Sequence, residues 1–140
     1  MNSRRGHRGY IGSRPYMGER APQHVQNLVV RDYCQRNGHS YLLSATEYAM
    51  PGCYVMLEEL LREVHQLEGV VLYSIFMLPR RRERRLEIYR RVLAAGATLH
   101  GALENLAVGT EADIAAIEDI WRIRSLHAEN AALRDLIAAG

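Results

Sequence analysis

The residues best suited to chemistry follow a short apolar stretch near the start of the chain. Residues 9–12 predict a β-strand, and a long polar loop comes after them. The loop and the first turn of the next helix carry groups that bind anions or move protons: Ser13, Arg14, Glu19, Arg20, Gln23 and His24. Guanidinium groups and the free N–H groups at a helix start bind phosphates and carboxylates. Long polar loops at strand ends are often functional, so we expect an anion site here, unless Arg14 and Glu19 merely pair and fix the loop.

Polar residues also end the second predicted strand, residues 40–45: Ser44, Thr46 and Glu47. Neighbouring strands bring their carboxyl ends to the same crevice of an open α/β sheet. Glu47 is the preferred general acid or base and His24 the second candidate, because each can hold a proton beside a bound ligand, to which Ser13 would donate a hydrogen bond. Two structural roles stay open: a salt bridge from Glu47 to Arg14 or Arg20, and a hydrogen-bonded structural His24.

An arginine-rich run, residues 80–85, follows a third apolar stretch at residues 70–76. We expect Arg80 to point into the same crevice and the other arginines to form a solvated helix face. A nucleic-acid partner is disfavoured, because the formal net charge is only +2 and no aromatic residues alternate with these arginines. The chain contains no lysine, which reflects either a genomic bias or a use of guanidinium forks.

Histidines and cysteines show no spacing typical of metal ligands. The six histidines are scattered along the chain: His7, His24, His39, His65, His100 and His127. We therefore predict no metal site. Neither GxGxxG nor GxxxxGK[ST] occurs, so no cofactor is predicted either.

Cysteine use and hydropathy indicate where the protein acts. Cys34 and Cys53 have no CxxC spacing, which suggests reduced thiols in a cytoplasmic protein. The start of the chain lacks the apolar segment of a secretory signal, and no apolar run approaches the length of a membrane span. We expect no membrane association.

These side chains must be positioned by alternating strands and helices. Strands are predicted from residue 8, at 40–45, at 70–76 and at 98–103, with a helix after each. Parallel strands need crossover helices, so this order predicts a small three-layer α/β sandwich with a mainly parallel four-stranded sheet. The predicted organisation is a disordered segment at 1–7, an α/β domain at 8–109, and a C-terminal helix at 110–140.

The last predicted helix is long and changes character along its length. Thr110 and Asp113 have the form of a capping box at its start. Its first half carries closely spaced apolar residues and is expected to cover the sheet. After Ser125 the sequence is rich in alanine with widely spaced leucines, which predicts either a homodimer contact or a frayed tail, because a single helix needs packing to be stable.

Four long segments resemble the sporadic carbohydrate cluster protein family. They are RGYIGSRPYMGERAPQHVQNLVVRDYC, YLLSATEYAMPGCYVMLEELL, GVVLYSIFMLPRRRERRLEIYRRVL and IEDIWRIR, within residues 8–124. These small bacterial proteins are encoded among genes for surface polysaccharide or lipopolysaccharide assembly. The resemblance implies a role near carbohydrate biosynthesis and carries over no catalytic residue, since the family's own activity is undefined.

A weaker resemblance is to the catalytic domain of serine recombinases. In that family a first strand with a YxRVS pattern bears the nucleophile. Residues 10–13, YIGS, are similar to it with one residue missing, which leaves Ser13 near the nucleophile position and no arginine before it. Residues 50–52, MPG, look like that family's arginine-proline-glycine, with methionine in place of arginine.

The recombinase family's LDRLxR pattern is matched less completely. Residues 75–80, IFMLPR, agree at the apolar positions and at Arg80, but Phe76 and Met77 replace the aspartate and the first arginine. Such arginines would stabilise a phosphoryl-transfer transition state, so their absence argues against strand cleavage. The resemblance implies a resolvase-like fold, to which a flavodoxin-like arrangement is the alternative, and a shared fold alone assigns no function.

Three hypotheses follow. The leading one is a protein of surface-glycan synthesis that binds or acts on a sugar phosphate or nucleotide sugar, held by Arg14, Arg20 and Arg80. The second is a non-enzymatic assembly or regulatory protein that dimerises through its last helix. The third is a catalytically inactive, recombinase-like DNA binder.

Overall fold

The computed structural model describes residues 4–16 and 20–139 of the chain. The strands are β1 (His7–Gly12), β2 (Tyr41–Glu47), β3 (Gly69–Leu72), β4 (Thr98–Gly101) and β5 (Leu106–Val108). The α-helices are α1 (Gln23–Arg36), α2 (Val55–Glu63), α3 (Arg82–Ala94) and α4 (Glu111–Ala139), and two short 3₁₀-helices are η1 (Val64–Gln66) and η2 (Ile75–Met77). The strands form one sheet in the order β2-β1-β3-β4-β5.

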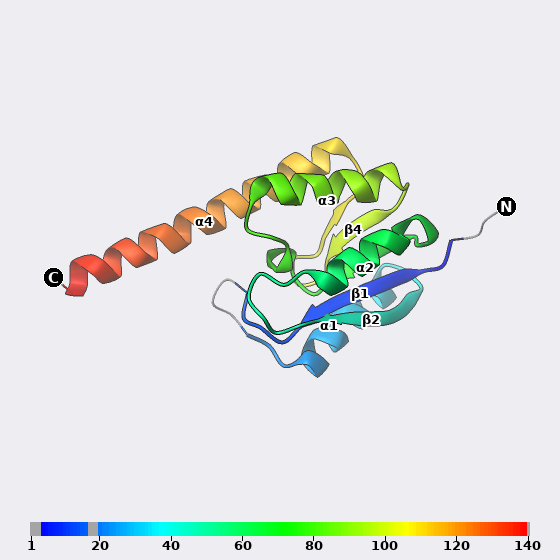
Figure 1. The fold of residues 1–140 in the computed structure, drawn as a ribbon, viewed down its shortest axis with the longest axis horizontal. Helices are drawn as coiled ribbons and strands as arrows, with labels where there is room; N and C mark the ends of the chain where they lie inside the picture. Colours follow the sequence, from blue (N-terminus) through cyan, green and yellow to red (C-terminus); the bar gives the residue numbers. More distant parts are fainter. Residues whose placement is uncertain (1–3, 17–19, 140) are drawn as a thin grey trace.

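Helices cover both faces of this sheet, as predicted (Figure 1). On one face, α2, α3 and the first half of α4 enclose the larger core, which includes the central strand residues Val70 and Leu72. On the other face, α1 packs Val30 and Tyr33 against β1 and β3. All four residues of β3 are buried, as a continuous apolar strand between two helical layers requires.

The predicted four-stranded sheet is wrong by one strand. β1 to β4 are parallel, but β5 returns antiparallel to β4 with Leu99 opposite Val108. The return is a short turn in which Asn105 has a φ of 55°, a left-handed conformation that asparagine tolerates better than most residues. A strand of three residues is too short to show a periodic pattern, which is why the sequence did not reveal it.

The central strand also ends earlier than predicted. β3 stops at Leu72, and η2 follows, with the Ser74 hydroxyl oxygen accepting a hydrogen bond from the N–H of Phe76. Glu104, in the β4–β5 turn, accepts hydrogen bonds from the Ser74 hydroxyl and from the N–H of Ile75. The chain therefore turns at the carboxyl edge of the sheet and delivers Arg80 to that edge.

Helix α4 begins with the predicted capping box. The Thr110 N–H donates to the Asp113 carboxylate, and the Asp113 N–H donates to the Thr110 hydroxyl oxygen. Ile114, Ile117 and Trp121 are buried, whereas every residue from 125 to 139 is exposed. The second half of α4 thus projects from the body (Figure 1). Within the described part of the chain, no helix combines the length and the apolar character needed to cross a membrane.

The start of the chain is tied to the body from Arg4 onward. The Arg4 guanidinium donates a hydrogen bond of 2.7 Å to the carbonyl of Leu67, and the Arg5 N–H donates to the carbonyl of Gln66. His7, which the sequence assigned to a disordered segment, is the first residue of β1. Residues 1–3 of that segment lie outside the described residues.

Candidate functional site

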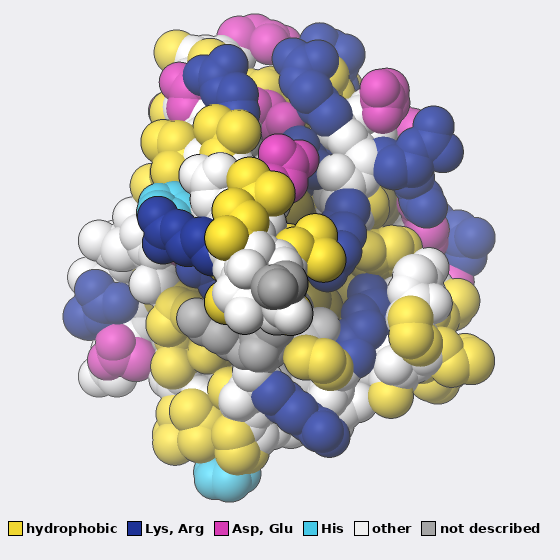
Figure 2. Space-filling view, turned by 90° about the vertical axis from the view of Figure 1, so that its left-hand side faces the viewer, with side chains coloured by type: hydrophobic (Ala, Val, Ile, Leu, Met, Phe, Trp, Pro, Cys, Tyr) yellow, Lys and Arg dark blue, Asp and Glu magenta, His cyan; other side chains and the backbone are white. Residues whose placement is uncertain are grey.

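An arginine-rich groove lies at the carboxyl edge of the sheet. Its volume is about 490 Å³. The lining residues come from the β1–α1 loop, the β2–α2 loop and the η2–α3 segment: Arg14, Pro15, Tyr16, Pro51, Gly52, Tyr54, Phe76, Leu78, Pro79, Arg80, Arg81 and Arg84. No carboxylate belongs to this lining as far as the described residues go. Figure 2 views this end of the molecule, where arginine and apolar side chains surround the projecting end of α4.

Arg14 forms the inner wall of the groove. Its Nη1 donates hydrogen bonds of 2.8 Å and 2.7 Å to the carbonyls of Met50 and Cys53, and so holds the β2–α2 loop in place. Its Nη2 is buried and has no hydrogen-bond partner among the described residues. An unsatisfied buried donor is costly, so a rearrangement that brings an oxygen acceptor to this nitrogen would be favourable.

Two tyrosines flank the guanidinium of Arg14. Its central carbon lies 5.4 Å from the ring centre of Tyr16 and 4.8 Å from that of Tyr54, both within cation–π range. Arg84 approaches the same Tyr54 ring at 5.5 Å. Burial raises the pKa of Tyr16 to about 12, so its hydroxyl stays protonated at neutral pH. Tyr54 therefore lies between two arginines, Arg14 and Arg84, that the sequence places in separate segments.

Arg80, Arg81 and Arg84 line the opposite wall and have exposed side chains. The sequence assigned Arg80 to the crevice, and it lies in the groove. It assigned Arg81 and Arg84 to a solvated face; both are exposed, yet they also line the groove. Since no acidic side chain lies among the lining residues that the structure describes, these positive charges add up in one place.

Arg85 is not part of a solvated helix face, contrary to prediction. It is buried and forms two hydrogen bonds of 2.8 Å with the carboxylate of Glu118 in α4. Its Nη1 donates to the carbonyls of Pro79 and Arg80, and its guanidinium stacks over Trp121 at 4.1 Å. Arg85 thus joins α3 to α4 and holds the backbone that carries Arg80.

Glu47, the preferred acid or base, is buried at the amino end of α2. Its carboxylate accepts a hydrogen bond of 2.7 Å from the Tyr10 hydroxyl. It also accepts from the N–H groups of Met56 and Leu57, in the first turn of α2. A carboxylate is favourable at a helix amino end, which explains this position. No ion pair joins Glu47 to an arginine among the described residues, and Glu47 does not line the groove.

The other predicted site residues separate into different environments. Ser13, half-buried, directly follows β1 but does not line the groove. Ser44 donates a hydrogen bond of 2.7 Å to Asn27 in α1. Thr46, Gln23 and His24 are exposed, and Arg20 lines a separate hollow of about 260 Å³ together with Glu104. Glu19 lies outside the described residues.

Gln26 is a structural residue that the sequence analysis overlooked. It is buried, its side-chain oxygen accepts from the N–H of Gly12, and its side-chain nitrogen donates to the carbonyls of Gly12 and Ala21. It therefore fixes the end of β1, from which the loop carrying Arg14 starts. Its position on the buried face of α1, in line with Val30 and Tyr33, was the available signal.

A second group of chemically competent side chains lies at the other end of the sheet. His7, His39 and His100 each place one ring nitrogen within 4.8 Å of the others. The predicted absence of a metal site depended on sequence spacing, which does not reveal this arrangement.

Comparisons with known proteins agree with the recombinase resemblance at the level of fold. No family model and no curated protein matches the sequence. A resolvase family site-specific recombinase from Streptococcus pneumoniae is similar in structure, with a TM-score of 0.61, 9% identity, and coverage of 94% of this chain and 97% of that chain. The N-terminal catalytic domain of TP901-1 integrase is similar with a TM-score of 0.59, 16% identity, and coverage of 92% and 98%.

The chain has a resolvase-like α/β fold. At these identities the similarity shows the fold and not the reaction. The resemblance to the sporadic carbohydrate cluster family receives no support from these comparisons. Two of the three segments that resemble recombinase motifs contribute to the arginine-rich groove, through Pro51 with Gly52 and through Arg80. The first, residues 10–13, does not line it, although Arg14 directly follows that segment.

Proposed function

We propose that this protein binds the phosphate backbone of DNA in its arginine-rich groove and does not cleave it. The observation that carries the proposal is the convergence of Arg14, Arg80, Arg81 and Arg84 on one groove, in which no carboxylate lies among the described lining residues. Arginine forks bind phosphate oxygens in pairs, and such contacts supply most of the affinity for nucleic acid. The fold similarity to recombinase catalytic domains favours DNA as the source of the phosphates.

The interleaving of rings and charges also supports a nucleic-acid ligand. The arginine-rich run contains no aromatic residue, but Tyr54 lies against both Arg14 and Arg84. Tyrosine and arginine together bind nucleotides by stacking and by charge. The sequence raised two objections to nucleic acid, the small net charge and the missing aromatic residues. The position of Tyr54, directly before α2, answers the second of them.

A neighbouring hollow extends the basic surface under α4. Its volume is about 680 Å³, and it shares Arg80 with the groove. The projecting helix contributes Arg124, Ser125 and His127 to its other wall. Arg80 and Arg124 would then be available to a phosphate next to the one held in the groove.

Strand cleavage is not part of the proposal. The nearest counterpart of the recombinase nucleophile, Ser13, does not line the groove. Phe76 and Met77 stand where the resemblance would place an aspartate and an arginine, and Met77 is fully buried. Binding without chemistry is the activity that these residues support.

Fluorescence anisotropy with a labelled random-sequence duplex tests the binding. The double variant Arg80→Gln/Arg81→Gln removes two groove charges, and Arg5→Gln/Arg90→Gln removes two exposed charges outside the groove. We expect the groove variant to reduce the slope of log affinity against log salt by about two, since each lost phosphate contact reduces it by about one. The control should keep the slope of the unmodified protein.

Two results would overturn this proposal. One is a lack of duplex binding at low salt, or an equal loss in both double variants. The other is a covalent protein–DNA species that appears with supercoiled plasmid and disappears in Ser13→Ala, because it would show that the protein cleaves strands.

A sugar phosphate or nucleotide sugar is the second candidate for the same groove. It is favoured by the position of Arg14 between two tyrosine rings, since a sugar or base could stack there while the guanidinium holds the phosphate. A ligand that binds only the folded state raises the melting temperature. A thermal shift with one nucleotide sugar, lost in Arg80→Gln/Arg81→Gln and accompanied by no duplex binding, would favour this function over DNA binding.

We further propose that two copies of the chain associate through the second half of α4. Exposed apolar residues recur from just before this half to its end at alternating spacings of three and four, interrupted by Asn130: Ile123, Leu126, Leu133 and Ile137. This is the spacing of a coiled-coil seam, and one asparagine in a seam is compatible with a dimer. An isolated projecting helix is marginal in water, so pairing would stabilise it.

Sedimentation equilibrium tests the dimer. Leu133→Asp should convert it to a monomer, whereas Arg134→Asp, which places the same charge one position away, should not. A monomeric unmodified protein, or equal dissociation in both variants, would contradict this assembly.

A further inference from the structure

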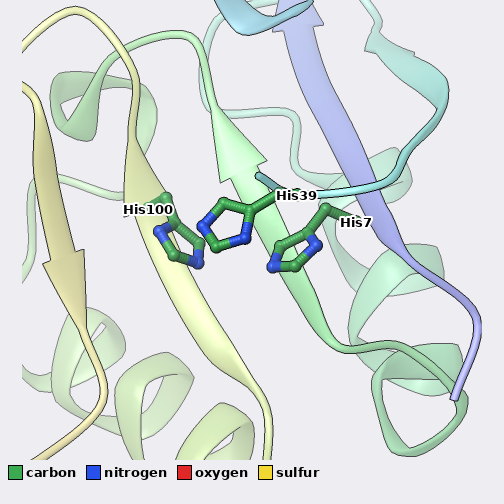
Figure 3. A group of neighbouring side chains, drawn as sticks. All are labelled: His7, His39 and His100. Carbon is green, nitrogen blue, oxygen red and sulfur yellow. The ribbon is translucent and has the colours of Figure 1, made fainter. Parts of the chain in front are cut away.

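Three histidines that are far apart in the sequence meet at the amino end of the sheet. His7 begins β1, His39 precedes β2, and His100 lies in β4. The ring of His39 lies between the other two (Figure 3), with ring centres 4.1 Å from His7 and 5.0 Å from His100. This cluster uses none of the residues of the arginine-rich groove, which lies beyond the opposite ends of the strands.

The strand beneath the cluster leaves room for it. β3 lies between β1 and β4, and its first residue, Gly69, is paired with His7 on one side and Thr98 on the other. A methyl group on Gly69 would approach the Cδ2 of His7 to 2.8 Å and the carbonyl oxygen of Thr98 to 2.6 Å. The His7 ring and Thr98 therefore fill the space that a side chain at this position would occupy.

The ring nitrogens are close enough to share an ion. One nitrogen from each ring lies within 4.8 Å of the other two, and the Nδ1 of His7 is buried without a hydrogen-bond partner among the described residues. Zinc binds imidazole nitrogen at about 2.0–2.1 Å, so modest side-chain rotations would bring three ligands around one ion. His39 is only half-buried, which leaves a route from solvent.

The surroundings of His100 provide the outer shell that such a ligand needs. Its Nδ1 is 2.7 Å from the Tyr33 hydroxyl, and its Nε2 is 2.7 Å from the Thr98 hydroxyl. A metal-bound histidine uses one nitrogen for the metal and donates its other N–H to an oxygen. One of these hydroxyls would orient the ring while the other gives way to the ion.

Two of the rings lie in surroundings that disfavour their charged forms. Burial and the neighbouring imidazoles lower the pKa of His100 to about 3, and burial with the nearby His39 lowers the pKa of His7. A neutral imidazole is the form that binds a metal.

We propose that His7, His39 and His100 form a binding site for one divalent transition-metal ion of the zinc class. Three imidazoles suit such an ion, and they leave one tetrahedral position for water. The bound ion would tie together β1, the α1–β2 connection and β4. The proposal is independent of DNA binding.

Titration of metal-free protein with Zn²⁺ against a chromophoric chelator tests the site, with His39→Ala as the main variant. His39 is the most accessible of the three, and no hydrogen bond of its ring is recorded among the described residues, so the variant should fold. The matched control is His65→Ala, which removes an exposed histidine outside the cluster. We expect one ion per chain, a dissociation constant at least about tenfold higher in His39→Ala, and no change in the control.

Cobalt identifies the ligands independently of affinity. Co²⁺ bound to the cluster should give visible d–d bands without a sulfur-to-metal charge-transfer band, and these bands should be absent in His39→Ala. The unmodified protein, but not this variant, should melt at a higher temperature with Zn²⁺. Failure to bind Zn²⁺, thiolate bands, or equal binding by His39→Ala and the unmodified protein would overturn the proposal.

Discussion

The two ends of the sheet hold two kinds of site built in opposite ways. At the carboxyl edge, four arginines gather on loops and on a helix start, and three of them are exposed. At the amino end, three histidines pack together; two are buried, and burial lowers their pKa values. The arginines stay positively charged and attract anions. The buried histidines favour the neutral form, whose nitrogen lone pairs can bind a metal ion.

This difference between the two sites follows from how arginine and histidine respond to burial. A guanidinium cannot give up its proton, so the buried Arg85 and the half-buried Arg14 are enclosed only with carbonyl, carboxylate or ring partners. The other groove arginines stay in water. An imidazole can become neutral at low cost, so it can be packed without a counterion. The same sheet therefore has a positively charged groove at its carboxyl edge and a cluster of histidines suited to metal binding at its amino end.

The largest loss of stability is expected from replacing Arg85, which supports the arginine-rich carboxyl edge of the sheet. Arg85→Met leaves the Glu118 carboxylate partly buried without its main partner, and should lower the free energy of unfolding by about 3 kcal/mol. Urea denaturation followed by circular dichroism measures this. Arg82→Met, whose exposed side chain lies 3.8 Å from the same carboxylate, should cost less than about 1 kcal/mol. Equal losses would mean that Arg85 does not hold α3 to α4.

A smaller loss of stability is expected from a substitution beside the histidine cluster, at the amino end of the sheet. Gly69→Ala forces a methyl group against the Thr98 carbonyl and the His7 ring, and should lower the free energy of unfolding by about 1–3 kcal/mol. It should also weaken Zn²⁺ binding while duplex binding stays unchanged. Gly109→Ala meets only ordinary contacts near 3.5 Å and should cost less than about 0.5 kcal/mol. If Gly69→Ala lost both Zn²⁺ binding and duplex binding, the sites at the two ends of the sheet would be coupled.

Acid should weaken the α3–α4 junction. Burial alone would raise the pKa of Glu118, but hydrogen bonds from Arg85 and Tyr89 and the charge of Arg85 hold it below its ordinary value of 4.5. The folded state then binds this proton less readily than the unfolded state, so the stabilisation is complete above pH 4.5 and is lost as pH falls through the folded pKa. The difference in unfolding free energy between the unmodified protein and Glu118→Gln should narrow below pH 4.5. A constant difference would contradict the lowered pKa.

The smallest effect concerns one charge at the rim of the groove. Arg84→Gln should reduce the salt dependence of duplex binding by about one unit of log–log slope and leave Zn²⁺ binding and stability unchanged. Arg90→Gln, on the same helix and outside the groove, is its control. An unchanged slope in Arg84→Gln would restrict the phosphate contacts to Arg14, Arg80 and Arg81.

Local patterns in the sequence were sufficient for most of the fold. Alternating apolar runs and stripes predicted four of the five strands and the four long helices, and the Thr110–Asp113 capping box set the start of α4. Such features depend on neighbours within a few residues along the chain, which is why they can be read from it directly. β5 was missed because three residues carry no measurable period.

The sites depended on contacts that no local pattern encodes. The sequence determined that arginines follow the third strand and that polar groups follow the first. Only the tertiary structure decided that Tyr54 joins Arg14 and Arg84, that Glu47 is enclosed at the amino end of α2, and that His7, His39 and His100 meet over Gly69. The physical reason is that parallel strands align residues through crossover connections of a dozen or more residues, so proximity is set by the order of strands in the sheet and not by spacing along the chain.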